Sequence, residues 1–269
     1  MTASELPLVL VVGGGEVGSA VSHRLSRSGM SVVVTDLEEP RCLRREVCFA
    51  MALMEGTKEV EGVRAARASD ASEAAALAAN GTVALLAADF LRVVSQLKPD
   101  VLIDARMTKT GEGIGRDLAP LVIGLGPGFT AGDNADVVIE TKRGHDLGRV
   151  IQEGSAHPDT GKPGPVMGFA EERVIWAPLT GRFASGLAIG TPVEKGRVVG
   201  YIEGTEVRAP ISGLLRGLVA DGIGVSEGRK IGDVDPRGST IDAATISDRG
   251  RAIGGGVLEA IMHWRWGRK

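Results

Sequence analysis

Three glycines near the start of the chain have the spacing of a phosphate-binding turn. Gly13, Gly15 and Gly18 form a G-x-G-x-x-G pattern within VVGGGEVGSAV, after an apolar run that predicts a strand and before a segment that predicts a helix. The first glycine of this pattern permits a tight turn, the second lets backbone amides approach a pyrophosphate, and the third lets helix and strand pack closely. The helix N-terminus adds partial positive charge. The pattern therefore predicts a site for a nucleotide-containing small molecule.

An acidic residue follows at the end of the next predicted strand. Asp36 comes 18 positions after Gly18, directly behind the apolar stretch 31–35. Its carboxylate is suited to accept hydrogen bonds from ribose hydroxyls and would repel a 2′-phosphate, which favours NAD-like over NADP-like ligands. The alternative is a dinucleotide fold whose site is empty or holds another ligand, because a fold does not fix a function.

The elements that position these residues alternate along the first half of the chain. Predicted strands at 83–86 and 101–104 and a buried strand before the loop 124–130 are separated by predicted helices, which favours a parallel sheet covered on both faces. Ligands of such sheets bind at the carboxyl ends of the strands. Arginines near this edge could clamp phosphates or could simply be solvated on a helix. The further candidate binding residues are Arg44, Arg45, Asp104, Arg106, Gly126, Gly128 and Thr130.

Two histidines lie in the segment that follows the last predicted strand of this half, which spans 137–141. His145 and His157 have Glu140, Asp146 and Glu153 nearby in the sequence. No spacing places two of these groups on one face as metal ligands, so we predict no metal site. His145 could contact a substrate or act as a general acid, and a surface histidine is the alternative.

Composition limits the classes of protein that this chain can belong to. It has 269 residues with 43% hydrophobic and 24% charged residues and a net charge of −3, which is globular composition with no electrostatic footprint for nucleic acid. No apolar run is long enough for a membrane span or a signal peptide, so we expect a cytoplasmic protein and no membrane partner. Cys42 and Cys48 lack zinc-site spacing and are interpreted as small buried hydrophobes or as a redox-active or chalcogen-carrying thiol.

The second half contains a duplication. Residues 175–202 match residues 207–234 at a constant offset of 32, with a shared Ala-Pro pair and matching glycines. Each copy predicts a short β-meander that needs its partner to complete a core. The pair resembles the barrel-sandwich hybrid of biotinyl and lipoyl carriers over about residues 173–236. The carriers' modified lysine is replaced by Glu203-Gly204-Thr205, which excludes covalent biotin or lipoate.

The predicted fold class is α/β plus β. We expect a Rossmann-like nucleotide-binding domain over 1–153, a Gly- and Pro-rich linker over 154–172, the duplicated barrel-sandwich hybrid over 173–236, and a C-terminal segment over 237–269. The last segment is expected to hold a helix that starts after the three glycines 254–256 and packs back onto one of the domains.

Segments spread over nearly the whole chain carry a family resemblance. The chain resembles the accessory proteins encoded with selenium-dependent molybdenum hydroxylases, and its glycine-loop region is more distantly similar to xanthine dehydrogenase maturation factors. Those factors often have a histidine in the first glycine loop, where this chain has Glu16. The segments that carry the resemblance are VVGGGEVGSAV, RREVCFAMALMEG, VEGVRA, LIDARMTK, APLVIGLGPGFTAG, ETKRGHDLGRVI, VRAPISGLLRGL and ISDRGRAIGGGVLEA.

The resemblance implies an accessory factor for cofactor maturation or insertion, with a molybdenum hydroxylase as partner. The candidate ligands are NAD and a molybdopterin dinucleotide, bound non-covalently, and a homo-oligomer is a further candidate assembly. No catalytic residue is assigned. Two alternatives stay open: an NAD-dependent oxidoreductase, which would need a proton donor such as Asp104, Lys109 or His145, and a non-catalytic scaffold.

Overall fold

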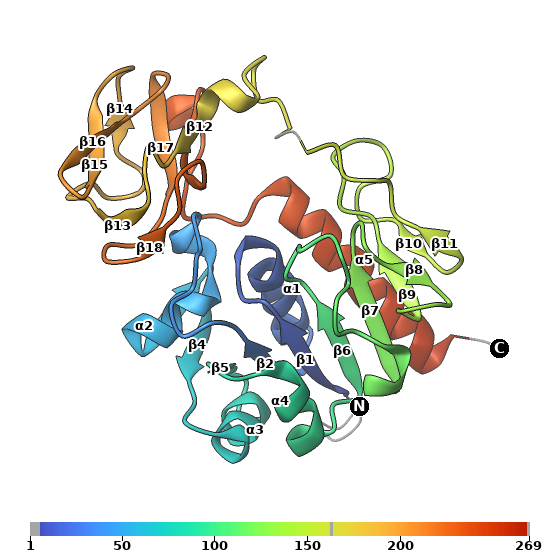
Figure 1. Ribbon diagram of the computed structural model, residues 1–269. Coiled ribbons are helices and arrows are strands. Elements are labelled where there is room, and N and C mark those ends of the chain that lie inside the picture. The colour runs from blue at the N-terminus through green and yellow to red at the C-terminus, as the bar shows by residue number, and fades with distance from the viewer. Residues whose placement is uncertain (1–5, 162–163, 268–269) are drawn as a thin grey trace. The chain divides into compact units, whose positions relative to one another are not determined.

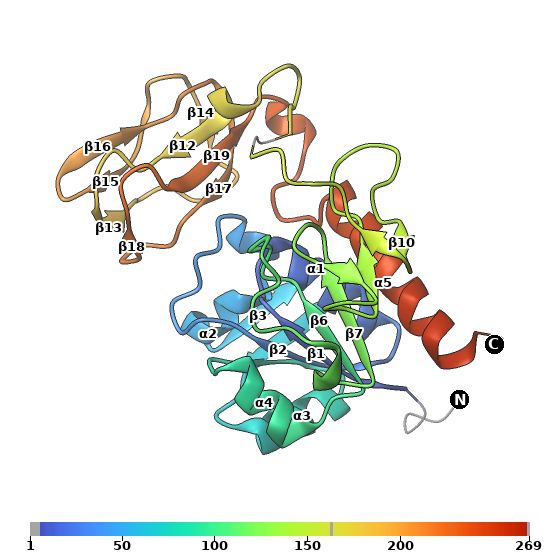
Figure 2. The same cartoon turned by 45° about the vertical axis from the view of Figure 1, so that its right-hand side comes forward.

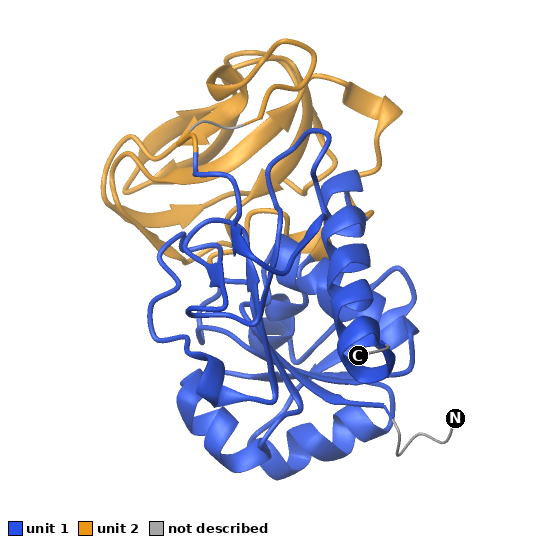
Figure 3. Cartoon of the chain, turned by 90° about the vertical axis from the view of Figure 1, so that its right-hand side faces the viewer, with its two compact units in different colours: residues 1–40, 48–159, 246–269 blue, residues 41–47, 160–245 orange. Residues whose placement is uncertain are grey.

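The computed structural model describes residues 6–161 and 164–267, and the two compact units of the chain are coloured in Figure 3. Unit 1 comprises Met1–Pro40, Cys48–Asp159 and Ile246–Lys269, and unit 2 comprises Arg41–Val47 and Thr160–Thr245. The region predicted as a barrel therefore lies within unit 2, and the predicted C-terminal segment is divided between the units. Positions 162 and 163 of the predicted linker lie outside the described residues.

Unit 1 is built on a nine-stranded sheet with spatial order β10-β9-β7-β6-β1-β2-β5-β4-β3, which Figures 1 and 2 show from two sides. The seven strands from β9 to β4 run parallel, so their carboxyl ends share one edge. Apart from β4, in which Arg64 and Arg67 are exposed, their short and almost fully buried apolar runs are typical of a parallel sheet covered on both faces. These strands are β1 (Leu8–Val12), β2 (Ser31–Thr35), β4 (Val63–Arg67), β5 (Val83–Leu86), β6 (Val101–Asp104), β7 (Leu121–Leu125) and β9 (Val137–Ile139).

Both edges of this sheet are antiparallel. β3 (Thr57–Val60) forms a hairpin with β4, and β10 (Val150–Ile151) pairs with β9. The hairpin turns through Glu61 and Gly62, both with positive φ, which is the two-residue turn that matches strand twist. A separate two-stranded sheet joins β8 (Thr130–Ala131) to β11 (Gly154–Ser155).

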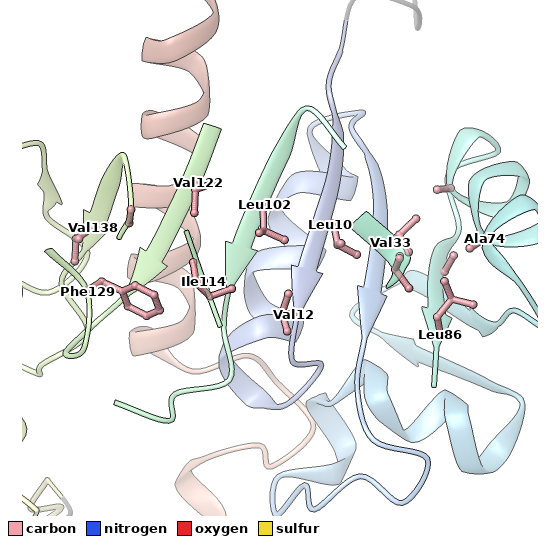
Figure 4. Packing of buried hydrophobic residues seen from close by; sticks show 14 of the residues in the cluster. Leu10, Val12, Val33, Ala74, Leu86, Leu102, Ile114, Val122, Phe129 and Val138 are labelled. Carbon is pink, nitrogen blue, oxygen red and sulfur yellow. The ribbon is translucent and has the colours of Figure 1, made fainter. Parts of the chain in front are cut away.

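Helices cover both faces of the sheet. α3 (Ala71–Ala79) and α4 (Phe90–Leu97) contribute Ala74 and Val93 to a buried cluster that includes Leu10 and Leu102 of the sheet, shown in Figure 4. The side chains of Asp70 and Asp89 cap α3 and α4 by accepting backbone N–H bonds. α1 (Glu16–Arg27) and α5 (Asp248–Trp266) pack on each other behind the sheet in Figure 4.

α5 starts earlier than the sequence predicts. Ser247 caps it by accepting from the amide of Gly250, so the three glycines 254–256 lie inside the helix and do not precede it. A Cβ on Gly256 would come closer than 3.0 Å to the carbonyl oxygen of Gly148, an approach that real Cβ atoms do not make. A Cβ on Gly255 would meet nothing within 4 Å. Packing therefore requires glycine at position 256 but not at position 255.

Unit 2 consists of two four-stranded antiparallel sheets, β12-β19-β17-β14 and β16-β15-β13-β18. Each sheet takes two strands from each sequence copy, so the core is shared between the copies. The segment 41–47 joins this unit, where Leu43 accepts a hydrogen bond from the amide of Leu218. The strands are β12 (Val174–Trp176), β13 (Gly181–Ala184), β14 (Pro192–Val193), β15 (Val198–Ile202), β16 (Thr205–Arg208), β17 (Gly213–Leu218), β18 (Gly224–Val225) and β19 (Lys230–Asp235).

A buried ion network crosses unit 2. Asp233 accepts from Arg173 at 2.7 Å and from Arg216 at 2.6 Å, and both the carboxylate and Arg173 are more than nine-tenths buried. Asp235 pairs with Arg216 and with Arg237. Burial opposes ionisation of Asp235, but the hydrogen bonds from Arg237 outweigh it and hold the pKa of this carboxyl below its usual value. Each carboxylate in the network is therefore matched by guanidinium donors.

The predicted arrangement of a Rossmann-like domain, a barrel-sandwich hybrid and an appended helix is wrong. The large sheet is mixed, because the turn at Glu61-Gly62 folds back a strand that the sequence analysis did not predict. The C-terminal helix belongs to unit 1, where small residues allow it to pack on α1, and unit 2 recruits 41–47 from the first half. Local patterns identify strands but do not specify which distant segments complete each unit.

Candidate functional site

The glycine turn lies at the carboxyl end of β1 and leads into α1. Gly13 has a φ of 99°, a conformation that disfavours other residues. A Cβ on Gly18 would come closer than 3.0 Å to the carbonyl oxygen of Gly13, whereas a Cβ on Gly15 would meet nothing within 4 Å. Gly13 and Gly18 are therefore required by the backbone, while Gly15 leaves open space at the start of the helix.

Asp36 belongs to the same turn. Its Oδ2 accepts a hydrogen bond of 2.7 Å from the Gly14 amide, and its Oδ1 accepts one of 2.7 Å from the Leu37 amide. The structure thus brings the predicted acidic residue to the predicted glycine loop. A carboxylate oxygen has a second lone pair, so each oxygen can still accept from a ligand hydroxyl.

Asp104 and Arg106 form an ion pair at the end of β6. Asp104 is 1% exposed, and its oxygens accept from the Arg106 guanidinium at 2.6–3.1 Å. Arg106 also donates to the Glu112 carbonyl and lies 5.0 Å from the centre of the Phe90 ring. Most donors of Arg106 are therefore engaged within the protein, and this residue is a weaker ligand candidate than the sequence suggests.

The loop after β7 supplies the next predicted residues. Gly126 and Gly128 both have positive φ, and a Cβ on either would collide with Thr141 or with the backbone near Lys109. Thr130 shares a hydrogen bond of 2.7 Å with the hydroxyl of Ser155. These residues shape the loop at the carboxyl edge of the sheet.

Arg44 and Arg45 do not belong to the unit that carries the other predicted residues. Arg44 donates to the carbonyls of Ala243 and Thr245, and Arg45 donates to the carbonyl of Leu218, all within unit 2. The order of the chain suggested a common crevice, but 41–47 folds with the second half. Cys42 and Cys48 form no disulfide with each other, and both are buried.

A cavity of about 580 Å³ lies beside the end of β9 and contains the groups most suited to proton chemistry. Glu140 is 1% exposed, and its Oε2 accepts from both the amide and the Nδ1 of His157 at 2.7 Å. Its Oε1 accepts from the amides of Thr141 and Lys142. Burial opposes ionisation, but these four donors outweigh it and hold the pKa of Glu140 below its usual value.

The ionised Glu140 determines which ring nitrogen of His157 carries a proton. A carboxylate only accepts hydrogen bonds, so Nδ1 of His157 carries a proton and, in the neutral ring, Nε2 carries a lone pair. Nε2 lies 4.0 Å from Asp146 Oδ2. The other histidine considered in the sequence, His145, is exposed and does not line the cavity. Within residues 6–161 and 164–267 no three His, Cys, Asp or Glu side chains gather as a metal site.

A half-buried arginine of α5 supports this region. Arg249 donates to the carbonyl of Thr141 at 2.9 Å. Burial lowers the pKa of Arg249 from its ordinary value, and Glu16, at the start of α1, opposes that shift. Glu16 also accepts from the Ser247 hydroxyl. α5 therefore links the glycine turn to the strand end that carries Glu140. No local pattern predicts this link, because the contacting residues are more than 100 positions apart.

Comparison with known proteins yields one curated relative and several distant structural likenesses. No protein-family model matches the chain. The uncharacterized protein YqeB of Escherichia coli K12 is 44% identical over 255 residues, which cover 95% of this chain and 47% of YqeB. The chain thus spans about half the length of the curated relative that it matches.

The solved structures are much more distant. A succinylglutamate desuccinylase/aspartoacylase from Rhodobacter sphaeroides is 17% identical with a TM-score of 0.27, and 86% of this chain and 85% of that chain are covered. An aspartoacylase family protein from Mesorhizobium loti is 12% identical with a TM-score of 0.28, over 86% and 85% of the two chains. Likenesses at this level assign neither activity to this chain.

These findings correct the resemblance stated from the sequence. The relatives found point elsewhere than to an accessory protein of selenium-dependent molybdenum hydroxylases or a xanthine dehydrogenase maturation factor: YqeB is uncharacterized, and similar solved structures are desuccinylase, aspartoacylase or ectoine utilization proteins. The functions attached to that resemblance, including the alternatives of an oxidoreductase and a scaffold, are withdrawn with it. No helix within the described residues is long and apolar enough to cross a membrane.

Proposed function

We propose that unit 1 binds a nucleotide-containing small molecule non-covalently at the carboxyl edge of its sheet. The observation that carries the proposal is the turn from Gly13 to Gly18, where the open position of Gly15 lies beside the carboxylate of Asp36. The first backbone amides of a helix have no partner within the helix, and the helix N-terminus carries partial positive charge, so the start of α1 has the chemistry that a phosphate prefers. NAD is the probe that this chemistry favours.

Asp36 supports selectivity for an unphosphorylated ribose. Its two oxygens are held by the amides of Gly14 and Leu37, which fixes the carboxylate at the turn. A ribose hydroxyl can donate to the remaining lone pairs, whereas a 2′-phosphate would meet a like charge. NAD should therefore bind more tightly than NADP.

Isothermal titration calorimetry of the full chain with NAD, ADP and NADP tests the proposal. Gly15→Asp places a negative side chain in the open space and should reduce NAD affinity at least tenfold without unfolding unit 1. Gly255→Asp is the matched control, because it adds the same side chain at another open glycine of unit 1, within α5. If wild type binds none of the probes, or Gly15→Asp binds NAD as wild type does, the glycine turn is not a nucleotide site.

Asp36→Asn tests the assigned selectivity. Asparagine keeps an oxygen that can accept from the Gly14 amide but removes the charge. NADP affinity should rise toward that of NAD in this variant, and an unchanged ratio would contradict the role of Asp36. A cytoplasmic location, expected from the sequence, forms part of this proposal and is checked by cell fractionation.

A further inference from the structure

The cavity beside the end of β9 is separate in chemistry from the glycine turn. Its volume is about 580 Å³, and its walls come from the segment 146–158 together with Glu140. Ser155 of this wall is held by Thr130. The charged or ionisable side chains among the lining residues are Glu140, Asp146, Arg149, Glu153 and His157.

His157 offers this cavity a directed hydrogen-bond acceptor. Its Nδ1 is committed to Glu140 at 2.7 Å, and its backbone amide donates to the same oxygen, so the ring is held at two points. The lone pair of a neutral imidazole then lies on Nε2. A ligand that contacts Nε2 of the neutral ring must therefore present an N–H or O–H donor.

The charges of the lining select among donors. Glu140, Asp146 and Glu153 are carboxylates, while Arg149 is the cation among the described lining residues and lies 3.7 Å from Asp146. A cationic donor gains from this excess of negative charge, a neutral hydroxyl does not, and an anion is repelled. Beyond the nucleotide site proposed above, we propose that this cavity binds a small primary amine, whose ammonium group donates to Nε2 of His157 and lies near Asp146.

Three small probes distinguish specific amine binding from nonspecific binding. Putrescine, 1,4-butanediol and butyrate have similar length but carry amines, hydroxyls and a carboxylate. Titration of the full chain, followed by amide NMR shifts, should show putrescine shifting residues 153–158 and binding at least tenfold more tightly than butanediol. Equal binding of the amine and the diol, or no binding of the amine, would overturn the proposal.

His157→Asn removes the acceptor, and His145→Asn is the matched control because His145 is exposed and lies outside the lining. Putrescine affinity should fall at least tenfold in His157→Asn and stay within twofold of wild type in His145→Asn. Equal loss in both variants, or loss in neither, would contradict the assigned site. Amide spectra that match wild type outside 140–158 show that each variant is folded.

Two further measurements keep the test independent of folding and of the nucleotide proposal. Glu153→Gln removes one exposed lining charge and should weaken putrescine about two- to threefold while butanediol is unaffected. The ¹⁵N shifts of His157 should show the proton on Nδ1, and a proton on Nε2 of the neutral ring would refute the acceptor role. Gly15→Asp should leave amine binding intact, so failure of one site does not imply failure of the other.

Discussion

The adjacent glycines 255 and 256 of α5 should respond in opposite ways to the same substitution. In a helix interior, alanine is favoured over glycine by about 1 kcal/mol. Gly255→Ala places its methyl group in open space, so unit 1 should gain about that amount. The methyl group of Gly256→Ala would come closer than 3.0 Å to the Gly148 carbonyl oxygen, which is backbone and cannot rotate away. Both variants share the helix-propensity gain, and only Gly256→Ala carries an overpacking cost of about 1–3 kcal/mol, so the two variants should differ by about 1–3 kcal/mol.

Gly256 also bears on the candidate amine site. The amide of Gly148 donates to the carbonyl of Glu140 at 2.9 Å, so displacement of this turn moves the strand end that carries Glu140. Urea unfolding is measured by tryptophan fluorescence in a Trp176→Phe background, which removes the tryptophan of unit 2. The signal then comes from Trp264 and Trp266 of α5 and reports on unit 1. Gly256→Ala should lower the urea midpoint and weaken putrescine, while Gly255→Ala should raise the midpoint and leave binding unchanged. A midpoint for Gly256→Ala equal to that of Gly255→Ala would refute the packing argument.

Four other predictions follow from the contacts above. Gly18→Ala should destabilise unit 1 by about 1–3 kcal/mol in urea unfolding, while Gly15→Ala should change its stability by less than about 0.5 kcal/mol. Arg106→Ala leaves a buried carboxylate without its guanidinium partner and should cost about 3 kcal/mol by the same assay. Asp233→Asn should destabilise unit 2 by about 3 kcal/mol, measured by hydrogen exchange of its strands. Because the pKa of Glu140 is lowered in the folded protein, its ionised carboxylate stabilises the fold above about pH 4.5, and this stabilisation is lost as the pH falls further. Glu140→Gln should therefore be less stable than wild type at pH 7. Its free energy of unfolding should also change less with pH in the acidic range, measured by urea unfolding at a series of pH values.

The glycine turn and the parallel strands could be predicted because their signals are local. The pattern from Gly13 to Gly18 needs only neighbouring residues to specify a turn before a helix, and the structure places Asp36 at that turn as expected. Short apolar runs between polar segments identified the buried parallel strands other than β4. The hairpin of β3 and β4 was missed, although glycine at a two-residue turn between β-branched residues is a local signal that is typical of a hairpin.

The start of α5 could not be predicted because its packing overrides helix propensity. Glycines disfavour a helix interior by about 1 kcal/mol each, which made 254–256 resemble a helix start. In the structure, a Cβ added to Gly254 would lie within 3.4 Å of atoms of Ala20 and Arg24 in α1. A Cβ added to Gly256 would meet the carbonyl oxygen of Gly148. The close approach to two distant segments offsets the propensity cost. The residues that neighbour 254–256 in the sequence do not indicate these contacts with distant segments.

The pairing of Glu140 with His157 could not be predicted from the sequence either. The two residues are 17 positions apart, and the segment between them contains only two-residue strands. Their pairing depends on β11 joining β8, which returns the chain to the sheet edge. The sequence analysis named Glu140 and His157 but chose His145 as the candidate histidine, because no periodicity extends through this segment to indicate which histidine faces Glu140.

The two proposed sites share one edge of the sheet but carry opposite electrostatic preferences. The glycine turn follows β1 and offers backbone amides to an anion, while Glu140 follows β9 and belongs to a lining that favours a cation. Three strand spacings separate β1 from β9, which is about 14 Å at roughly 4.8 Å per strand. This exceeds the Debye length of about 8 Å at physiological ionic strength, so exposed charges at one site are largely screened from the other. Each site must therefore owe its selectivity to its own residues, and variants at Gly15 and His157 should act separately.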